Sequence, residues 1–361
     1  MKLTELKLTD FRNIAAAHFT PAPELTVICG ENGQGKTNLL EGVWLQTGAK
    51  SFRGAKDVQL VRENAAFAVL ESVIETQTDT QQIRISIGGA QAEKQGRYAK
   101  INGVEYGRAT AIAGRCTAVV FAPVHLSLVK GSPDGRRKFM DAALCQIKPA
   151  YITLLRQYTR IVSQKNALLK SYFKTQGGND LLDVFDEKLA EAAVQIITAR
   201  QTFLQDIKQN TVHNYSDISA GREQLQYTYE CSCDEVNVAS SLRAARQKDI
   251  AAGFCTTGPH RDDLFITIDG RDARVYASQG QQRSAVLSLK LAEAANVKQA
   301  TGEHPIMLLD DVLSELDAGR QAYLLNRMQG KQTIVTTCDA HPFLETNGKL
   351  VQMADGALTE V

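Results

Sequence analysis

The stretch Gly30-Glu31-Asn32-Gly33-Gln34-Gly35-Lys36-Thr37 decides the fold of this chain. It fits the pattern G-x-x-x-x-G-K-[ST], it follows the apolar run Leu25 to Cys29, and it leads into a helical pattern from Lys36 to about Leu45. A glycine-rich loop between a strand and a helix turns its backbone N–H groups toward a phosphate, and the helix start adds partial positive charge. We therefore expect the nucleotide-binding residues to be Gly30, Glu31, Asn32, Gly33, Gln34, Gly35, Lys36, Thr37 and Asn38.

Two side chains of this loop and two later carboxylates predict ATP and Mg²⁺ as cofactors. Lys36 can reach the β- and γ-phosphates, and the Thr37 hydroxyl can bind Mg²⁺. The apolar run Ile306 to Leu309 ends in Asp310, which we expect to be the second metal ligand. Asp311 follows, and its side chain would point another way and polarise the attacking water. Lys36 and Asp311 are therefore the predicted catalytic residues of ATP hydrolysis.

A second glycine-containing turn, Ser278-Gln279-Gly280-Gln281, precedes a long helical pattern. A serine hydroxyl, a glycine backbone and a helix N-terminus together can hold an anion. One chain with one phosphate loop has no use for a second such turn, so we expect it to close over the nucleotide of a second copy in a two-fold homodimer. Leu316 and Asp317 are expected at the same interface. The alternative is that Ser278 only caps its helix.

The middle of the chain is predicted to be helical. Apolar residues keep alternating three- and four-residue spacing from Met140 to Leu168, interrupted by Lys165, and again from Leu182 to Ile207. Gln176 to Asn179 separates the two segments, which predicts an antiparallel helical hairpin. It is either a short coiled-coil arm or an ordinary helical subdomain. We expect an α/β head in two parts, residues 1–135 and 253–361, with a helical arm lobe at 136–252.

The overall charge gives no reason to expect bulk attraction to nucleic acid, because 41 basic residues face 40 acidic ones. Any contact with DNA must then come from a local patch. The candidates are Arg136, Arg137 and Lys138 with Arg53 and Arg115, although a solvated helix start also explains the first three. Seven scattered cysteines, and no apolar run long enough to cross a membrane, predict a cytoplasmic, nucleoid-associated protein that has no membrane partner.

Taken together, these motifs resemble the ABC-type ATPases, and the helical insertion resembles the Rad50, structural-maintenance-of-chromosomes and RecF group. Transport ATPases of this superfamily commonly carry a histidine where this chain has Thr337. Six segments resemble the RecF family in particular and run in order along nearly the whole chain. They are Asp10 to Asn13, Gly30 to Asn38, Val129 to Pro133 with the following Arg136, Arg137 and Phe139 to Asp141, Gly258 to Asp263, Ser278 to Arg283, and Asp310 to Asp317.

The resemblance implies a function that residue spacing alone does not. It implies an ATP-dependent homodimer that binds double-stranded DNA and its junctions with single-stranded DNA. It also implies work with RecR and RecO to load RecA at gaps during recombinational and replication repair, with slow ATP turnover as a switch. Arg12 and Asn13 would lie beside the nucleotide, with Arg12 touching a phosphate. The alternatives are an ABC-type ATPase coupled to another DNA-processing or transport partner, and a scaffold that binds ATP only to dimerise.

Overall fold

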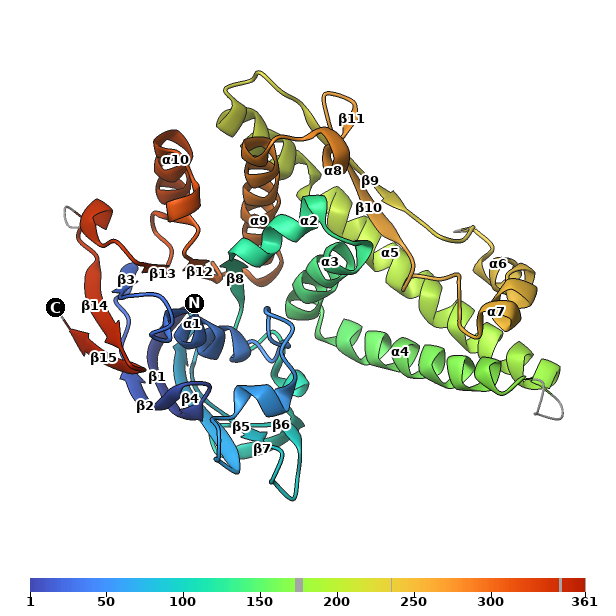
Figure 1. The fold of residues 1–361 in the computed structure, drawn as a ribbon, viewed down its shortest axis with the longest axis horizontal. Coiled ribbons are helices and arrows are strands. Elements are labelled where there is room, and N and C mark those ends of the chain that lie inside the picture. The colour runs from blue at the N-terminus through green and yellow to red at the C-terminus, as the bar shows by residue number, and fades with distance from the viewer. Residues whose placement is uncertain (173–177, 235, 344–345, 361) are drawn as a thin grey trace.

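Two six-stranded sheets form the head, and a helical arm projects from it (Figure 1). The computed structural model describes residues 1–172, 178–234, 236–343 and 346–360. Gln176 and Gly177 of the predicted break therefore lie outside the described residues.

The first sheet carries the phosphate loop and has the order β15-β14-β3-β13-β12-β8. All neighbours are parallel except β14 and β15. Every residue of β12 and β13 is buried, as expected for parallel strands covered on both faces. Because β3, β12 and β13 run in the same direction, their carboxyl ends meet at one edge of the sheet. The strands are β3 (Leu25–Cys29), β8 (Ala118–Phe121), β12 (Ile306–Asp310), β13 (Thr333–Thr337), β14 (Lys349–Ala354) and β15 (Ala357–Glu360).

The second sheet is antiparallel, with the order β2-β1-β4-β5-β6-β7. Helix α1 (Lys36–Leu45) contributes to the same apolar core as this sheet and strands of the first one, which fixes the helix behind the phosphate loop. Asn102 and Gly103 have φ values of 50° and 81° and form the tight hairpin turn that joins β6 to β7. The strands are β1 (Lys2–Phe11), β2 (Ile14–Phe19), β4 (Phe67–Glu75), β5 (Thr80–Gly88), β6 (Gly96–Ile101) and β7 (Val104–Arg108).

Short segments and two longer helices complete the head. The short segments are η1 (Asp57–Leu60), η2 (Ala109–Ile112), η3 (Pro123–Leu126), α2 (Ser127–Lys130), α8 (Ala273–Tyr276), η5 (Leu313–Glu315) and η6 (His341–Phe343). The longer helices are α9 (Gln279–Thr301) and α10 (Ala318–Met328). β14 and β15, at the end of the chain, are strands that the sequence patterns did not predict.

The arm confirms the predicted helical hairpin and adds to it. Pro149 is the first residue of α4, where its missing N–H costs nothing, so one apolar pattern is divided between two helices. α6 packs on α5 and α7 on α4, so the arm is a helical lobe and not two helices alone. Its elements are α3 (Pro133–Ile147), α4 (Pro149–Lys170), α5 (Gly178–Ser219), β9 (Leu225–Glu230), α6 (Val238–Ala244), α7 (Arg246–Ala252), β10 (Asp263–Ile268) and β11 (Arg271–Asp272).

The arm and the start of α9 share one core. Buried apolar residues from Leu128 to Ala292 form a single cluster, and α5 packs along α9. The core therefore continues across the predicted boundary between residues 252 and 253.

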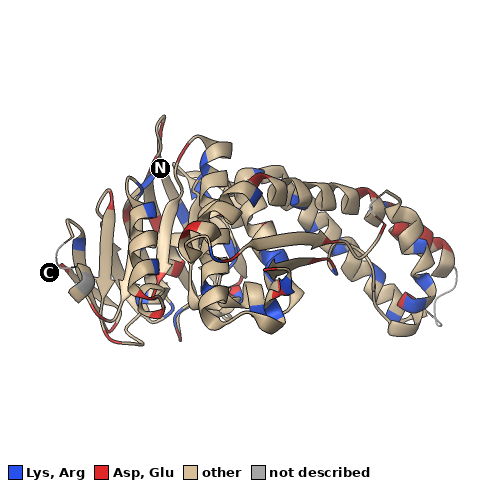
Figure 2. Cartoon of the chain, turned by 90° about the horizontal axis from the view of Figure 1, so that it is seen from above, with Lys and Arg blue, Asp and Glu red and all other residues tan. Residues whose placement is uncertain are grey.

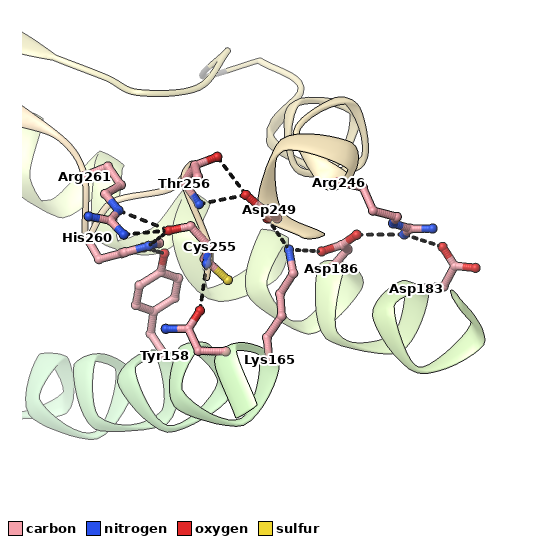
Figure 3. Close-up of polar contacts among 11 residues, drawn as sticks. Tyr158, Lys165, Asp183, Asp186, Arg246, Asp249, Cys255, Thr256, His260 and Arg261 are labelled. Carbon is pink, nitrogen blue, oxygen red and sulfur yellow. Dashed lines mark hydrogen bonds and ion pairs between the residues drawn. The ribbon is translucent and has the colours of Figure 1, made fainter. Parts of the chain in front are cut away.

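A buried charge network fixes the outer part of the arm (Figure 3). Lys165, which interrupts the apolar pattern, is 0% exposed, and its Nζ lies 2.7 Å from Asp186 and 3.0 Å from Asp249. Arg246 bonds to Asp186 and Asp183. A buried cation requires such partners, so this network ties together α4, α5 and α7.

Candidate nucleotide site

Close packing at one position and a left-handed backbone at the other explain two glycines of the phosphate loop. A Cβ on Gly30 would lie 2.3 Å from the carbonyl oxygen of Met353 in β14. Gly35 has φ = 113°, and a Cβ there would lie 2.9 Å from Oδ1 of Asn13. No side chain fits at either position, so the loop can follow this path only with glycine.

Three side chains converge at the carboxyl edge of the parallel sheet. The Thr37 hydroxyl donates to Oδ1 of Asp310 at 2.7 Å, and Thr336 donates to the same oxygen at 2.9 Å. The ammonium of Lys36 is held by the carbonyl oxygens of Gly30 and Glu31, at 2.6 and 2.8 Å. The structure thus brings together residues that are 273 positions apart in the sequence.

These donors suit Mg²⁺ bound together with phosphates. Burial raises the pKa of Asp310, and the two threonine hydrogen bonds oppose that shift. A hydroxyl and a carboxylate oxygen side by side are ligands that Mg²⁺ accepts, and it normally takes its remaining ligands from water and substrate phosphates. The described part of the chain holds no cluster of three or more His, Cys, Asp or Glu residues that could bind a metal ion.

Asp311 leaves the end of β12 in a left-handed conformation, with φ = 52°. Its N–H donates to the carbonyl oxygen and the hydroxyl of Thr336. This left-handed residue bends the chain directly after Asp310. The catalytic role of Asp311 stays a prediction.

Asn13 lies beside the phosphate loop, whereas Arg12 is engaged elsewhere. Asn13 donates to the carbonyl oxygen of Gln34 and accepts from Asn38 at 2.7 Å. The guanidinium of Arg12 instead binds both carboxylate oxygens of Glu41, at 2.9 and 3.1 Å. Glu41 is 0% exposed and needs a cation, so the structure does not support the predicted contact of Arg12 with a phosphate.

Arg53 belongs to this same network. It bonds to Asn38 at 2.8 Å and lies 3.9 Å from Glu41. It is thus a neighbour of α1, which separates it from the predicted patch around Arg136. The sequence patterns did not predict the role of Glu41, although a single carboxylate within an otherwise apolar helix is a signal that the sequence contains.

The end of the chain supports the loop in ways that the motif did not reveal. The N–H groups of Asp355 and Gly356, in the turn between β14 and β15, donate to Gln34. Thr337 closes a turn with Asp339, and that turn places Sγ of Cys338 3.5 Å from Lys36. These contacts join segments more than 300 residues apart, which local pattern reading cannot find.

Ser278 caps α9 in this protomer. Its hydroxyl accepts from the N–H of Gln281, and the Gln281 side chain accepts from the N–H of Ser278. A Cβ on Gly280 would lie 3.2 Å from the guanidinium of Arg320, so a larger residue there would require Arg320 to shift by a few tenths of an ångström. Gln279 is the first residue of the helix. The cap leaves the predicted role toward a second copy as a prediction.

Arg320 joins this turn to the segment after β12. Its Nε donates to Ser284 in α9 at 2.9 Å, and its guanidinium also binds Asp317, the N-cap of α10. Leu316 is buried beside them. The two predicted interface segments therefore form one unit within the protomer.

The predicted basic patch needs correction. Arg136 is 3% exposed and binds both oxygens of Asp263, at 2.5 and 2.8 Å, so it is not available to DNA. Arg137 donates to the carbonyl oxygen of Asp262. Both arginines thus hold the segment Gly258 to Asp263 against α3. Of the other candidates, Arg53, Arg115 and Lys138 are exposed.

The comparisons with known proteins agree with this architecture. The family model described as "RecF/RecN/SMC N terminal domain" matches residues 2–357. A protein of Halalkalibacterium halodurans named "DNA replication and repair protein RecF" is 39% identical over 349 residues, covering 93% of this chain and 92% of that protein. A Bacillus subtilis protein of the same name is 36% identical, with 100% of both chains covered. The chain belongs to the RecF family.

A solved RecF structure extends the agreement to three dimensions. It is described as the recombination mediator protein RecF-ATPrS in the RecFOR pathway, and it matches with a TM-score of 0.90 at 32% identity. The match covers 100% of this chain and 98% of that chain. The predicted fold, an ABC-type ATPase head with an inserted helical lobe, is therefore confirmed for this RecF-family chain. Among its described residues, no helix is long and apolar enough to cross a membrane.

Proposed function

We propose that this chain is an ATP-dependent DNA-binding switch of recombinational and replication repair. ATP and Mg²⁺ bind at Gly30 to Asn38 and Asp310, and hydrolysis assisted by Asp311 resets the protein. The observation that carries the proposal is the 2.7 Å bond between Thr37 and Asp310, since it sets a hydroxyl and a carboxylate side by side at the end of a phosphate loop. The ATP-type ligand named for the solved RecF structure supports the same assignment.

The second half of the proposal is a homodimer in which each chain completes the site of the other. Ser278 and Gly280 close over the γ-phosphate held by the partner, and Leu316 and Asp317 line the same interface. The exposed N-terminus of α9 supports this, because its backbone N–H groups favour an anion. Arg320 holds both segments in one unit, so they can dock together.

The dimer binds double-stranded DNA and its junctions with single strands, at the nucleoid, and it helps RecR and RecO load RecA. The name "DNA replication and repair protein RecF" of the relatives and the RecFOR pathway named for the solved structure support this part. The near-zero net charge requires that DNA contact come from a local surface.

Sedimentation velocity with ATP, with ADP, and with ATP plus a gapped duplex tests the proposal. We expect dimers only with ATP, a further shift with the duplex, and hydrolysis that the duplex alters. Asp79→Asn, in an exposed turn, should behave as the wild type. A wild-type protein that hydrolyses ATP but whose dimers and turnover ignore DNA would contradict the repair function.

A further inference from the structure

The arm contains a long stretch without a single acidic residue. Positions 142–179 have no Asp or Glu, although the chain has 40 of them in 361 residues. This stretch includes the whole of α4, whereas α5 has acidic residues from Asp180 onward. Lys and Arg are mixed with Asp and Glu over most of the molecule (Figure 2), and no other stretch of the sequence is as long without an acidic residue.

The outward face of α4 combines cations with small polar side chains. Arg156, Arg160 and Lys170 are exposed, and Lys148 is exposed at the helix start. Among the described residues, no carboxylate pairs with any of these four. The aromatic residues Tyr151 and Tyr158 and the remaining cation, Lys165, are all buried on the opposite side. The other exposed positions are Pro149, Ala150, Thr153, Gln157, Thr159, Ser163, Gln164 and Ala167.

Two of the cations, Arg156 and Arg160, lie four residues apart and form a short ridge on one face of the helix. Lys148 precedes the helix as its N-cap, in a non-helical backbone conformation. Figure 1 shows α4 along the edge of the arm on the side of the antiparallel sheet. At its start, Arg156 donates to Thr110, and Pro149 packs on Gly114 next to the exposed Arg115. The ridge therefore begins at the junction of arm and head.

We infer that this face of α4, with Arg115, docks the sugar-phosphate backbone of double-stranded DNA. Arg, Lys, Ser, Thr and Gln are side chains that commonly contact phosphates. A helix face without carboxylates does not repel those phosphates. A surface for single strands would offer exposed aromatic rings on which bases stack, and this face has none. The docking surface reads no bases, so it binds duplexes of any sequence. This inference rests on the proposed DNA-binding function and gives it a location.

Salt-dependent binding to a duplex tests the inference. The test variant is Lys148→Gln/Arg160→Gln, which leaves Arg156 and its contact with Thr110 intact. The matched control is Lys188→Gln/Lys208→Gln, two exposed lysines of α5 with the same loss of charge. Fluorescence anisotropy with ATP is measured between 50 and 200 mM salt, on two duplexes of unrelated sequence and on one single strand.

We expect the test variant to lose about two units of the slope of log K against log salt, and roughly tenfold or more in affinity at low salt. Both duplexes should be affected equally, and the control should match the wild type. ATP-driven dimers of the variant should also be normal, since both side chains are exposed and unpaired by any described carboxylate.

Three results would overturn the inference. A variant that binds duplexes with the wild-type slope removes α4 from the contact and leaves the proposed function standing. A variant that loses single-strand binding while duplex binding is unchanged shows that the partner class is wrong. A wild-type protein that binds no DNA in any of these measurements contradicts both the proposed function and this docking surface.

Discussion

At the scale of single residues, a substitution of Asp310 can remove the metal ligand without disturbing the local fold. Both threonine hydrogen bonds end on its Oδ1, and the carbonyl oxygen of an asparagine can accept the same two bonds. Asp310→Asn should therefore keep the local structure while losing the negative charge that attracts Mg²⁺.

We expect Asp310→Asn to lower single-turnover ATP hydrolysis by about a hundredfold or more, since a metal contributes several kcal/mol to stabilising the transition state. Its melting temperature should not fall, because a buried charge has been removed. Asp79→Asn is again the matched control. Hydrolysis within a few-fold of the wild type would exclude Asp310 as the metal ligand.

His260 is a residue whose effect depends on pH. In its neutral form, its Nε2–H donates to the carbonyl oxygen of Cys255, and its Nδ1 accepts from the Tyr158 hydroxyl at 2.7 Å (Figure 3). Burial lowers the pKa of His260 to about 4 from its ordinary value of 6.5. The stability that comes from its neutral form is present above pH 6.5 and is lost as the pH falls toward 4, because the unfolded chain then binds the proton more tightly.

The wild type should therefore lose about 3 kcal/mol more unfolding free energy between pH 7 and pH 4 than His260→Gln does. Glutamine can make both hydrogen bonds but does not titrate. Urea unfolding at the two pH values measures the difference. Equal losses in both proteins would show that His260 is not the titrating group.

At the scale of elements, Ser278 at the N-terminus of α9 caps the helix and, under our proposal, also contacts the γ-phosphate held by the partner. Ser278→Ala removes an N-cap and should destabilise the protein by about 1 kcal/mol. Ser278→Asp keeps a good cap, so its melting temperature should stay near that of the wild type. The carboxylate would nevertheless face the γ-phosphate of the partner, and ATP-driven dimers should disappear in sedimentation. Normal dimers of Ser278→Asp would leave Ser278 as a cap and nothing more.

Some elements of the site could be predicted from the sequence, and others could not. The phosphate loop, the strand ending in Asp310 and the start of α9 each combine a periodic apolar pattern with a local turn or cap, so their position could be predicted. Arg136 was misread because its partner, Asp263, lies 127 residues away. Glu41 and Met353 matter through contacts of the same long-range kind, which no local pattern contains.

At the scale of the whole molecule, the proposed dimer contains two identical sites, each shared by both chains. Lys36→Ala spoils only the phosphate loop of its own chain, and Ser278→Asp spoils only the site of its partner. A heterodimer of the two variants therefore contains one intact site.

Mixing the two inactive variants in equal amounts should restore measurable hydrolysis, up to about half of the wild-type rate, since only the mixed dimer has an intact site to hold it together and that site is one of two. Each variant alone serves as the control. If the mixture is as inactive as its components, the two motifs do not meet across a dimer.

The core that α5 shares with α9 has a mechanical consequence. At 42 residues, α5 is about 63 Å long, so a tilt of about 5° about its base displaces the far end by roughly 5 Å. Because its base is packed on α9, which Ser278 caps, α5 can act as a lever whose short side is the N-terminal turn of α9. A ligand that pulls on the distal end would thus apply torque at the turn that we propose contacts a second copy, and a small rotation there would become a wide swing of the arm.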